Sequence, residues 1–246
     1  MQNLFMITLL FLISACSVVK KPPYQSTIQI NTIDNVDYET VDKKHKASLK
    51  KGEILVKKGE IQNAILNYFN PIINDYEKVY DSSLKKIYTA RTQKEHDFYL
   101  MTANNQQKTA HILSETWSEA YYLKTYALLE LKDLRTAQTT IQKALKLAPS
   151  NSKYLAELGL TYQLQKAWKK ALISYSSAEK SARFFSPKKL QKEEYIRAKR
   201  GMGYSLIELK ELNKAETLYR EILKILPKDK IAQRELNYIL ELKKRE

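Results

Sequence analysis

Small and large apolar residues recur at helical spacing over the second half of the chain. Ala171, Tyr175 and Ala178 stand at positions i, i+4 and i+7, so they share one face of a helix. The same pattern lies 34 residues earlier and 44 residues later, at Ala137, Ile141, Ala144, Ala215, Tyr219 and Ile222. A preceding apolar stripe accompanies each of these. The pattern therefore predicts pairs of amphipathic helices that repeat along the chain.

This period divides the second half of the chain into repeated units. Pro149 and Pro227 close the first and third units, where a proline ends a helix without a clash. The second unit lacks this proline, and ten extra residues follow it. The units so defined are residues 118–151, 152–185 and 196–229.

Helix-start signals refine the end of the chain. Ser186-Pro187 is a typical helix start, so we expect the third unit's first helix to begin near Pro187 and to end at about Lys210. Asp229 is the expected cap of a last helix, residues 230–243. A polar-backed terminal helix of this kind covers the last apolar face of a stacked array.

One motif of the second unit identifies a family resemblance. Leu155-x-x-Leu158-Gly159-x-x-Tyr162, followed by Ala171-x-x-x-Tyr175-x-x-Ala178, resembles the tetratricopeptide repeat. The resemblance implies an all-α fold, a helix–turn–helix solenoid with an irregular helical N-terminal part. Such solenoids usually bind other chains and seldom perform chemistry. Thr125 and Lys199 depart from the family pattern, and the alternative is a helical bundle with accidental spacing.

The segment 47–117 is less regular. Residues 47–80 resemble a degenerate repeat, in which Gly52, Ala64 and Tyr68 keep the glycine, alanine and aromatic spacing of the second unit. Pro71 interrupts the second helix of this unit, so we expect a kink or an early stop there.

Two capping boxes organise the rest of this segment, Thr92-x-x-Glu95 and Thr116-x-x-Glu119. Residues 80–117 do not match the repeat, and we expect an irregular helical insertion against the first face of the solenoid. No strand is predicted. The expected helices span residues 93–104, 106–113 and 117–131.

The front of the chain has the features of an exported protein. Residues 1–15 carry no charged side chain, and their apolar run is too short to span a bilayer. Ile13-Ser14-Ala15-Cys16 resembles the bacterial lipoprotein cleavage motif, which implies that Cys16 is lipidated and that residues 1–15 are removed. An ordinary signal peptide with an incidental cysteine is the alternative. Residues 16–46 are mostly polar without sustained periodicity, so we expect a flexible tether.

The lipoprotein resemblance also implies a location. Ser17, rather than an aspartate, follows the cysteine, which in many Gram-negative species directs a lipoprotein to the outer membrane, facing the periplasm. A Gram-positive host would place the protein on the outer face of the plasma membrane.

Charge and chemistry narrow the function classes. The net charge is +15, yet the lysines are spread along the chain, which indicates a solvated basic surface or attraction to lipid head groups. An exported protein does not meet nucleic acid, so none is expected as partner. His45, His96 and His111 are too scattered for a metal set. No nucleophile motif or phosphate loop is present, and we expect neither an enzyme nor a cofactor.

The family geometry places the binding surface on the first helices of the repeats, which line a concave groove. We therefore expect a protein or peptide partner, and a scaffold or adaptor in envelope assembly or secretion. The alternatives are a periplasmic ligand- or glycan-binding module and an enzyme regulator. Tyr122 and Tyr126 would equally well pack on the preceding irregular helices. The candidate groove residues are Tyr122, Tyr126, Leu129, Lys153, Ala156, Leu160, Gln163, Arg197, Arg200, Tyr204 and Glu208.

Overall fold

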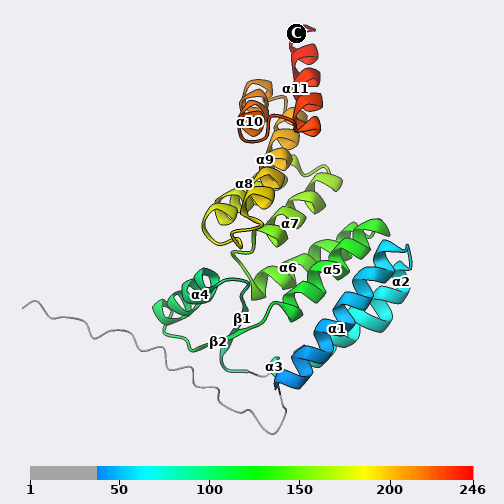
Figure 1. Ribbon diagram of the computed structural model, residues 1–246, viewed down its shortest axis with the longest axis vertical. Helices are drawn as coiled ribbons and strands as arrows, with labels where there is room; N and C mark the ends of the chain where they lie inside the picture. The colour runs from blue at the N-terminus through cyan, green and yellow to red at the C-terminus, as the bar shows by residue number, and fades with distance from the viewer. Residues whose placement is uncertain (1–37, 82, 246) are drawn as a thin grey trace, which may run out of the picture. The chain divides into compact units, whose positions relative to one another are not determined.

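The computed structural model describes residues 38–81 and 83–245, and this part of the chain is a helical repeat array with a small inserted sheet (Figure 1). The predicted signal peptide, Cys16 and the first part of the predicted tether lie outside the described residues. The elements are α1 (Tyr38–Lys57), α2 (Ile61–Ala64), the π-helical turn η1 (Ile65–Phe69), α3 (Asn70–Tyr80), β1 (Lys86–Thr89), α4 (Gln93–Asn105), β2 (Ala110–Leu113), α5 (Thr116–Glu130), α6 (Leu134–Leu147), α7 (Ser152–Leu164), α8 (Trp168–Phe184), α9 (Gln191–Glu208), α10 (Leu212–Ile225) and α11 (Lys230–Lys243).

The helices form two layers, as the repeat pattern predicts. The first helices α1, α5, α7, α9 and α11 each contact the next one in this order, and we call this layer the first-helix wall. The second helices α3, α6, α8 and α10 each pack against the two first helices on either side. The all-α solenoid expected from the sequence is thereby confirmed.

Glycine and aromatic pairs set the spacing between the layers. A β-carbon at Gly159 would lie 2.8 Å from the Tyr175 ring, and one at Gly203 would lie 2.7 Å from the Tyr219 ring. Gly52 meets Phe69 in the same way in the front unit. The first and second helices can therefore approach this closely only where the first helix lacks a side chain.

The turn inside each helix pair has a residue in the left-handed region. Gly59 occupies this position in the front unit, and Lys132, Lys166 and Lys210 occupy it in the three repeats, with φ between 57° and 61°. Left-handed backbone favours glycine because other residues bring their β-carbon close to the carbonyl oxygen. The repeats therefore share one turn geometry despite different turn sequences.

The last described helix, α11, is capped as predicted and has a polar face. Asp229 accepts a hydrogen bond from the Ala232 amide at 3.0 Å, which confirms the predicted cap of α11. Gln233 and Asn237 stand where the second repeat has Leu155 and Gly159, and both are exposed. These exposed carboxamides make this face of α11 polar.

A β1–α4–β2 insertion separates the front unit from the first repeat. β1 and β2 pair in parallel, with Lys86 opposite Ala110 and Thr89 opposite Leu113. The expected helix 106–113 is wrong, because α4 ends before Gln107, whose φ is 56°, and the chain then extends into β2. The insertion contacts α5 and α6 rather than covering the first face of the solenoid.

The two capping boxes have different outcomes. The Thr92 hydroxyl accepts from the Glu95 amide at 3.1 Å, as predicted, although the Glu95 carboxylate bonds the Arg91 amide at 2.6 Å. The second box is wrong. Glu115 occupies the cap of α5 without a side-chain bond, and Thr116 is already inside the helix.

Two segments interrupt the repeat period, the β1–α4–β2 insertion and the extra segment between the second and third repeats, and they contact each other. The Arg91 guanidinium, next to α4, donates to the Glu194 carboxylate of α9 at 2.7 Å, and the Ser186 hydroxyl donates to the same carboxylate. The Thr92 hydroxyl donates to the Phe185 carbonyl at 3.0 Å. The insertion and the extra segment between the second and third repeats therefore form one buried polar interface, on which α4 lies beside the α8–α9 connection (Figure 1).

Two helix starts differ from expectation, and one predicted helix stop does not occur. α1 begins at Tyr38, so residues 38–46 are helical rather than part of the tether, and Asp42 in this stretch accepts from the Tyr76 hydroxyl. α9 begins at Gln191, because residues 187–190 form a turn first. Pro71 does not stop its helix, since the π-helical turn just before it absorbs the distortion.

Candidate functional site

All the candidate groove residues lie on the first-helix wall, on α5, α7 and α9. Their environments differ, however, and the differences separate side chains that hold the fold from side chains that face solvent. No helix among residues 38–81 and 83–245 is long and apolar enough to cross a membrane.

The basic candidates are neutralised within the chain. Lys153 pairs with Glu119 at 2.6 Å, Arg197 with Glu157 at 2.5 Å, and Arg200 with Asp229. The carboxylates of Glu157 and Asp229 are each 1% exposed. Burial would lower the pKa of Arg197, but the Glu157 carboxylate outweighs it and the pKa is raised. These cations therefore neutralise carboxylates of the chain itself, two of which are buried.

Other candidates connect adjacent units. The Gln163 amide donates to the Gly201 carbonyl at 2.9 Å and to the Ser205 hydroxyl at 3.0 Å, and its oxygen accepts from the Tyr175 hydroxyl at 3.1 Å. Ala156 is buried. Both residues belong to the contact between the second and third repeats.

Tyr122 also packs within the array. Its ring stacks on Tyr154 with centroids 5.4 Å apart, and the Lys153 ammonium lies 4.5 Å from its centroid. Burial raises the pKa of the Tyr122 phenol. Tyr122 therefore packs on α7 rather than on the insertion, whereas Tyr126 is 41% exposed.

Four equivalent positions of the wall form a row of partly or well exposed side chains, and we call them the tyrosine row: Tyr126, Leu160, Tyr204 and Tyr238. Tyr204 is 41% exposed and Tyr238 is 49% exposed, while Leu160 is partly exposed. Tyr238 was not among the sequence candidates. It lies 34 residues after Tyr204, so extending the repeat period into α11 would have found it.

A second row lies one helical turn beyond the tyrosine row. Its members alternate as Glu130, Leu164, Glu208 and Leu242, and the two glutamates are exposed. Burial and then the nearby carboxylates, Glu130 and Glu208 respectively, raise the pKa values of Tyr126 and Tyr204. The sequence predicted Glu208 as a groove residue and missed Glu130. Leu129 is partly buried beside the front-unit core.

The two tryptophans do not form an open platform. Trp117 is buried and stacks on Tyr76 with centroids 5.5 Å apart. Trp168 packs edge to face against Tyr204 of the tyrosine row, with ring centroids 6.0 Å apart.

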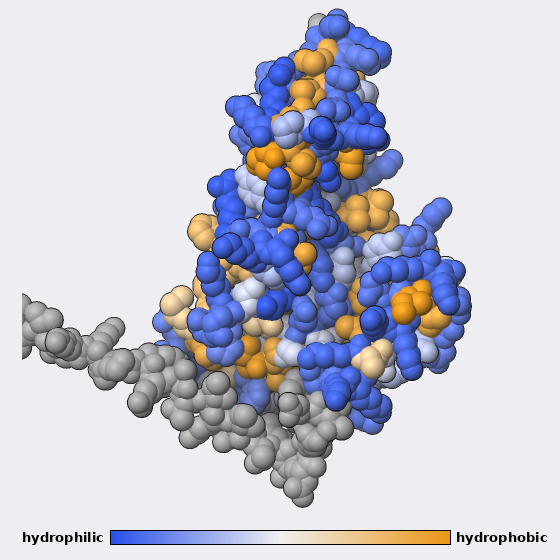
Figure 2. All heavy atoms as spheres, viewed as in Figure 1, coloured by the Kyte–Doolittle hydropathy of each residue, from blue (hydrophilic) through white to orange (hydrophobic). Residues whose placement is uncertain are grey.

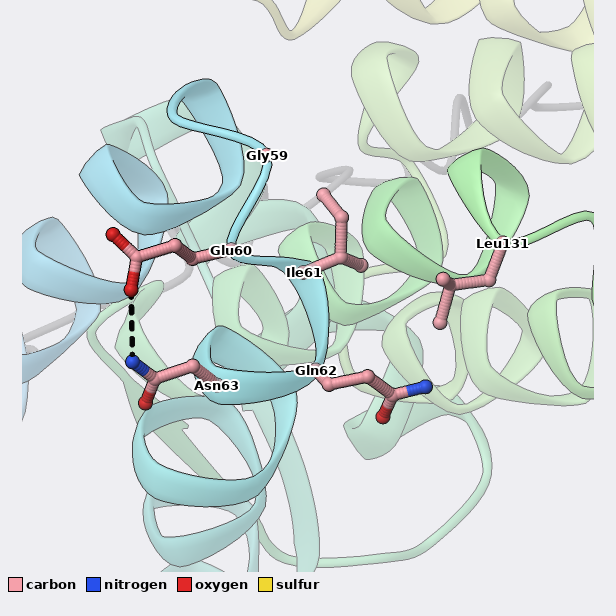
Figure 3. Close-up of a pocket in the computed structure, with 6 residues that line it drawn as sticks. All are labelled: Gly59, Glu60, Ile61, Gln62, Asn63 and Leu131. Carbon is pink, nitrogen blue, oxygen red and sulfur yellow. Dashed lines mark hydrogen bonds between the residues drawn. The ribbon is translucent and has the colours of Figure 1, made fainter.

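A shallow, open hollow lies at the turn between α1 and α2, facing Leu131 at the end of α5 (Figure 3). It is lined by the segment 59–63, in which the Asn63 amide donates to Glu60 at 3.1 Å. The hollow has no residue set suited to catalysis. Within the described ranges, no group of three or more His, Cys, Asp or Glu side chains is placed to hold a metal ion.

On the face drawn in Figure 2, hydrophilic side chains predominate and apolar ones form separate groups. The tyrosine row and the second row together expose aromatic rings, aliphatic side chains and two carboxylates.

Comparisons with known proteins agree with this architecture. Residues 118–151 match the tetratricopeptide repeat family. Pseudomonas aeruginosa pilF has a similar structure, with 14% identity and a TM-score of 0.57 over 84% of this chain and 72% of that chain. The yeast histone chaperone Hif1, described as a scaffold protein recruiting protein complexes to core histones, has 11% identity and a TM-score of 0.56 over 84% and 96%.

A shorter likeness is the first tetratricopeptide repeat domain of Spaghetti (RPAP3), solved with the HSP90 peptide SRMEEVD. It has 18% identity and a TM-score of 0.47 over 53% of this chain and 95% of that chain. No curated protein sequence matches the chain. Residues 118–151 are thus a tetratricopeptide repeat, and the helix pairs around it build a solenoid of the tetratricopeptide-repeat type.

Proposed function

We propose that the chain is a scaffold or adaptor that holds a protein or peptide partner on its first-helix wall. The observation that carries the proposal is the tyrosine row, which leaves three rings accessible on one layer of the fold, with Leu160 between the first two. Tyrosine combines a large apolar body with a polar tip, and it is enriched among the residues that dominate interface energies. A repeated wall of this kind suits an extended chain better than a compact ligand.

The wall fits a peptide better than a glycan. Sugar-binding sites combine exposed aromatic rings with free carboxamides, but the Gln163 carboxamide is fully engaged by Gly201, Ser205 and Tyr175. Figure 3 shows two carboxamides, Gln62 and Asn63, at a turn of the front unit instead. The chemistry of the wall also favours binding over catalysis.

A pair of matched variants tests the wall. The first replaces Tyr126, Tyr204 and Tyr238 by alanine. The control replaces Val79, Ile173 and Ile225 by alanine, because these exposed apolar side chains belong to the second helices α3, α8 and α10. Proteins captured by each variant from solubilised envelope are quantified by mass spectrometry. We expect the tyrosine variant to lose the captured partner and the control to keep it. Equal capture by both variants, each with a wild-type thermal melt, would refute the proposed surface.

We further propose that the scaffold is a lipoprotein of the bacterial envelope, held through Cys16 in the outer membrane and facing the periplasm. The support is the sequence Ile13-Ser14-Ala15-Cys16, in which the chain has its one cysteine. Metabolic labelling with a fatty acid tests this. We expect wild-type protein to be labelled and Cys16→Ser protein to remain unlabelled. Equal labelling of both would exclude acylation at this residue.

A further inference from the structure

In the tyrosine row and the second row the charged side chains, Glu130 and Glu208, are negative, although the chain as a whole is strongly basic. The cations among the candidate groove residues, Lys153, Arg197 and Arg200, are each paired with a carboxylate of the chain. Two of these carboxylates, Glu157 and Asp229, are buried, and Glu157 retains one oxygen without a partner. A ligand carboxylate would have to compete with a buried counter-charge, and leaving a buried charge unpaired is strongly unfavourable.

The exposed carboxylates beside the tyrosine row have no cation partner in the described part of the chain, and their neighbours are the hydroxyls of Tyr126 and Tyr204. Glu130 and Glu208 form no ion pair with any residue of the described ranges 38–81 and 83–245. They stand at equivalent positions two units apart, each one helical turn from a tyrosine of the row. The raised pKa values of Tyr126 and Tyr204 are consistent with a negative field at these rings.

The apolar positions complete the pattern. Leu164, which is 48% exposed, lies between the two glutamates in the second row, and the partly exposed Leu160 lies between two tyrosines of the tyrosine row. The accessible surface therefore alternates between carboxylate and aliphatic side chains along a line of rings. A segment with the complementary alternation can place its cations on the glutamates and its apolar side chains on the rings and leucines.

We infer that the partner segment is an extended stretch of protein in which lysine or arginine alternates with aromatic or aliphatic residues. This inference rests on the proposed function, because it specifies what the same wall binds. Unpaired, Arg197 and Arg200 of α9 would suit an acidic segment, but their ion pairs with Glu157 and Asp229 remove that option. Arginine would also stack on the exposed rings of the tyrosine row.

Three synthetic peptides of equal length test the inference. All three carry the same leucines and tyrosines, and the intervening residues are lysine, glutamine or glutamate. Binding to the full-length protein in detergent is measured by calorimetry. We expect the lysine peptide to bind tightest and the glutamate peptide weakest. The double variant Glu130→Gln and Glu208→Gln should reduce the preference for lysine by roughly two- to tenfold, since exposed ion pairs contribute modestly.

Matched controls separate this wall from the rest of the basic chain. Glu60→Gln and Asp81→Asn remove exposed carboxylates outside the wall and should leave the preference unchanged. Tyr204→Ala should weaken the binding of all three peptides, because it removes a ring of the wall that each of them would contact.

The outcomes distinguish the inference from the proposed function. Tighter binding of the glutamate peptide, or a lysine preference that survives Glu130→Gln and Glu208→Gln, would overturn the inference and leave the wall as a binding surface. Binding of the lysine peptide that is indifferent to Tyr204→Ala would place it elsewhere and overturn the inference as well. If no peptide binds and the tyrosine variant also captures its partner normally, the proposed function fails.

Discussion

Tyr175 lies between two glycines of successive first helices, and this arrangement gives the sharpest test of the packing. A β-carbon at Gly159 would come within 2.8 Å of the Tyr175 ring, and one at Gly201 on the opposite helix would also overlap it. The ring is 4% exposed, and its hydroxyl is bonded to Gln163. It therefore cannot retreat from a new methyl group at Gly159.

Two opposing terms decide the effect of Gly159→Ala. Overpacking of a well-packed core typically costs about 1–3 kcal/mol. Alanine in a helix interior gains about 1 kcal/mol over glycine. Carbon atoms in contact normally lie about 3.5–4.0 Å apart, so the overlap at 2.8 Å is severe and overpacking should win. We expect the free energy of unfolding to fall by about 1–2 kcal/mol.

A double-mutant cycle with Tyr175→Ala isolates the overlap. Tyr175→Ala alone should cost about 3–5 kcal/mol, the range for a buried aromatic ring. Once the ring is absent, only the helix-propensity term remains, so Gly159→Ala should become stabilising. Unfolding free energies are measured by urea titration. Gly203→Ala is the control, because its β-carbon would meet the Tyr219 ring instead, and its effect should not depend on Tyr175. A destabilising Gly159→Ala in both backgrounds would refute the reasoning.

Three further changes have expected outcomes. Arg91→Met removes the cation partner of two buried carboxylates, Glu95 and Glu194, so urea titration at pH 7 should show a loss of about 3–5 kcal/mol. The loss should be smaller at pH 4, because burial raises the pKa of Glu95 and protonation removes its buried charge. Burial would raise the pKa of Asp42, but hydrogen bonds and Lys46 hold it at about 2, below its ordinary 3.8. Its contribution is therefore complete above pH 4 and lost as the pH falls towards 2. Asp42→Asn should cost about 1–2 kcal/mol at pH 6 and little at pH 2. Lys166→Gly should raise the melting temperature by relieving the left-handed residue, whereas Lys169→Gly, inside a helix, should lower it.

Helix pairs could be predicted from the sequence because their signals are local. The glycine, aromatic and alanine positions of the second repeat lie within a few helical turns of each other, and the caps at Thr92 and Asp229 depend on three neighbouring residues. The same period, continued by one more unit, also points to Tyr238.

The sheet could not be predicted because its pairing is not local. β1 and β2 have four residues each, and their register depends on α4, which separates them. The start of α9 was missed for a similar reason, since Ser186 bonds Glu194 and this carboxylate also binds Arg91, 103 residues away.

The ion pairs of the wall could not be predicted from the sequence, because the carboxylates that pair with Arg197 and Arg200 lie far along the chain, in α7 and at the cap of α11. Arg197 and Glu157 are 40 residues apart, and Arg200 and Asp229 are 29 apart. A helical pattern places each arginine on the wall correctly, but it does not show which carboxylate the arginine meets. Removing Arg197 or Arg200 is therefore expected to lower stability, and such variants are unsuitable for mapping the binding surface.

Site-specific photo-crosslinking in cells tests the central claim most directly. A photoreactive residue replaces Tyr204 on the first-helix wall in one protein and Ile173 on the second-helix layer in another, since both side chains are exposed. We predict that position 204 forms a discrete crosslinked adduct with a protein partner and that position 173 does not. An adduct formed from position 173 and absent from position 204 would contradict the account.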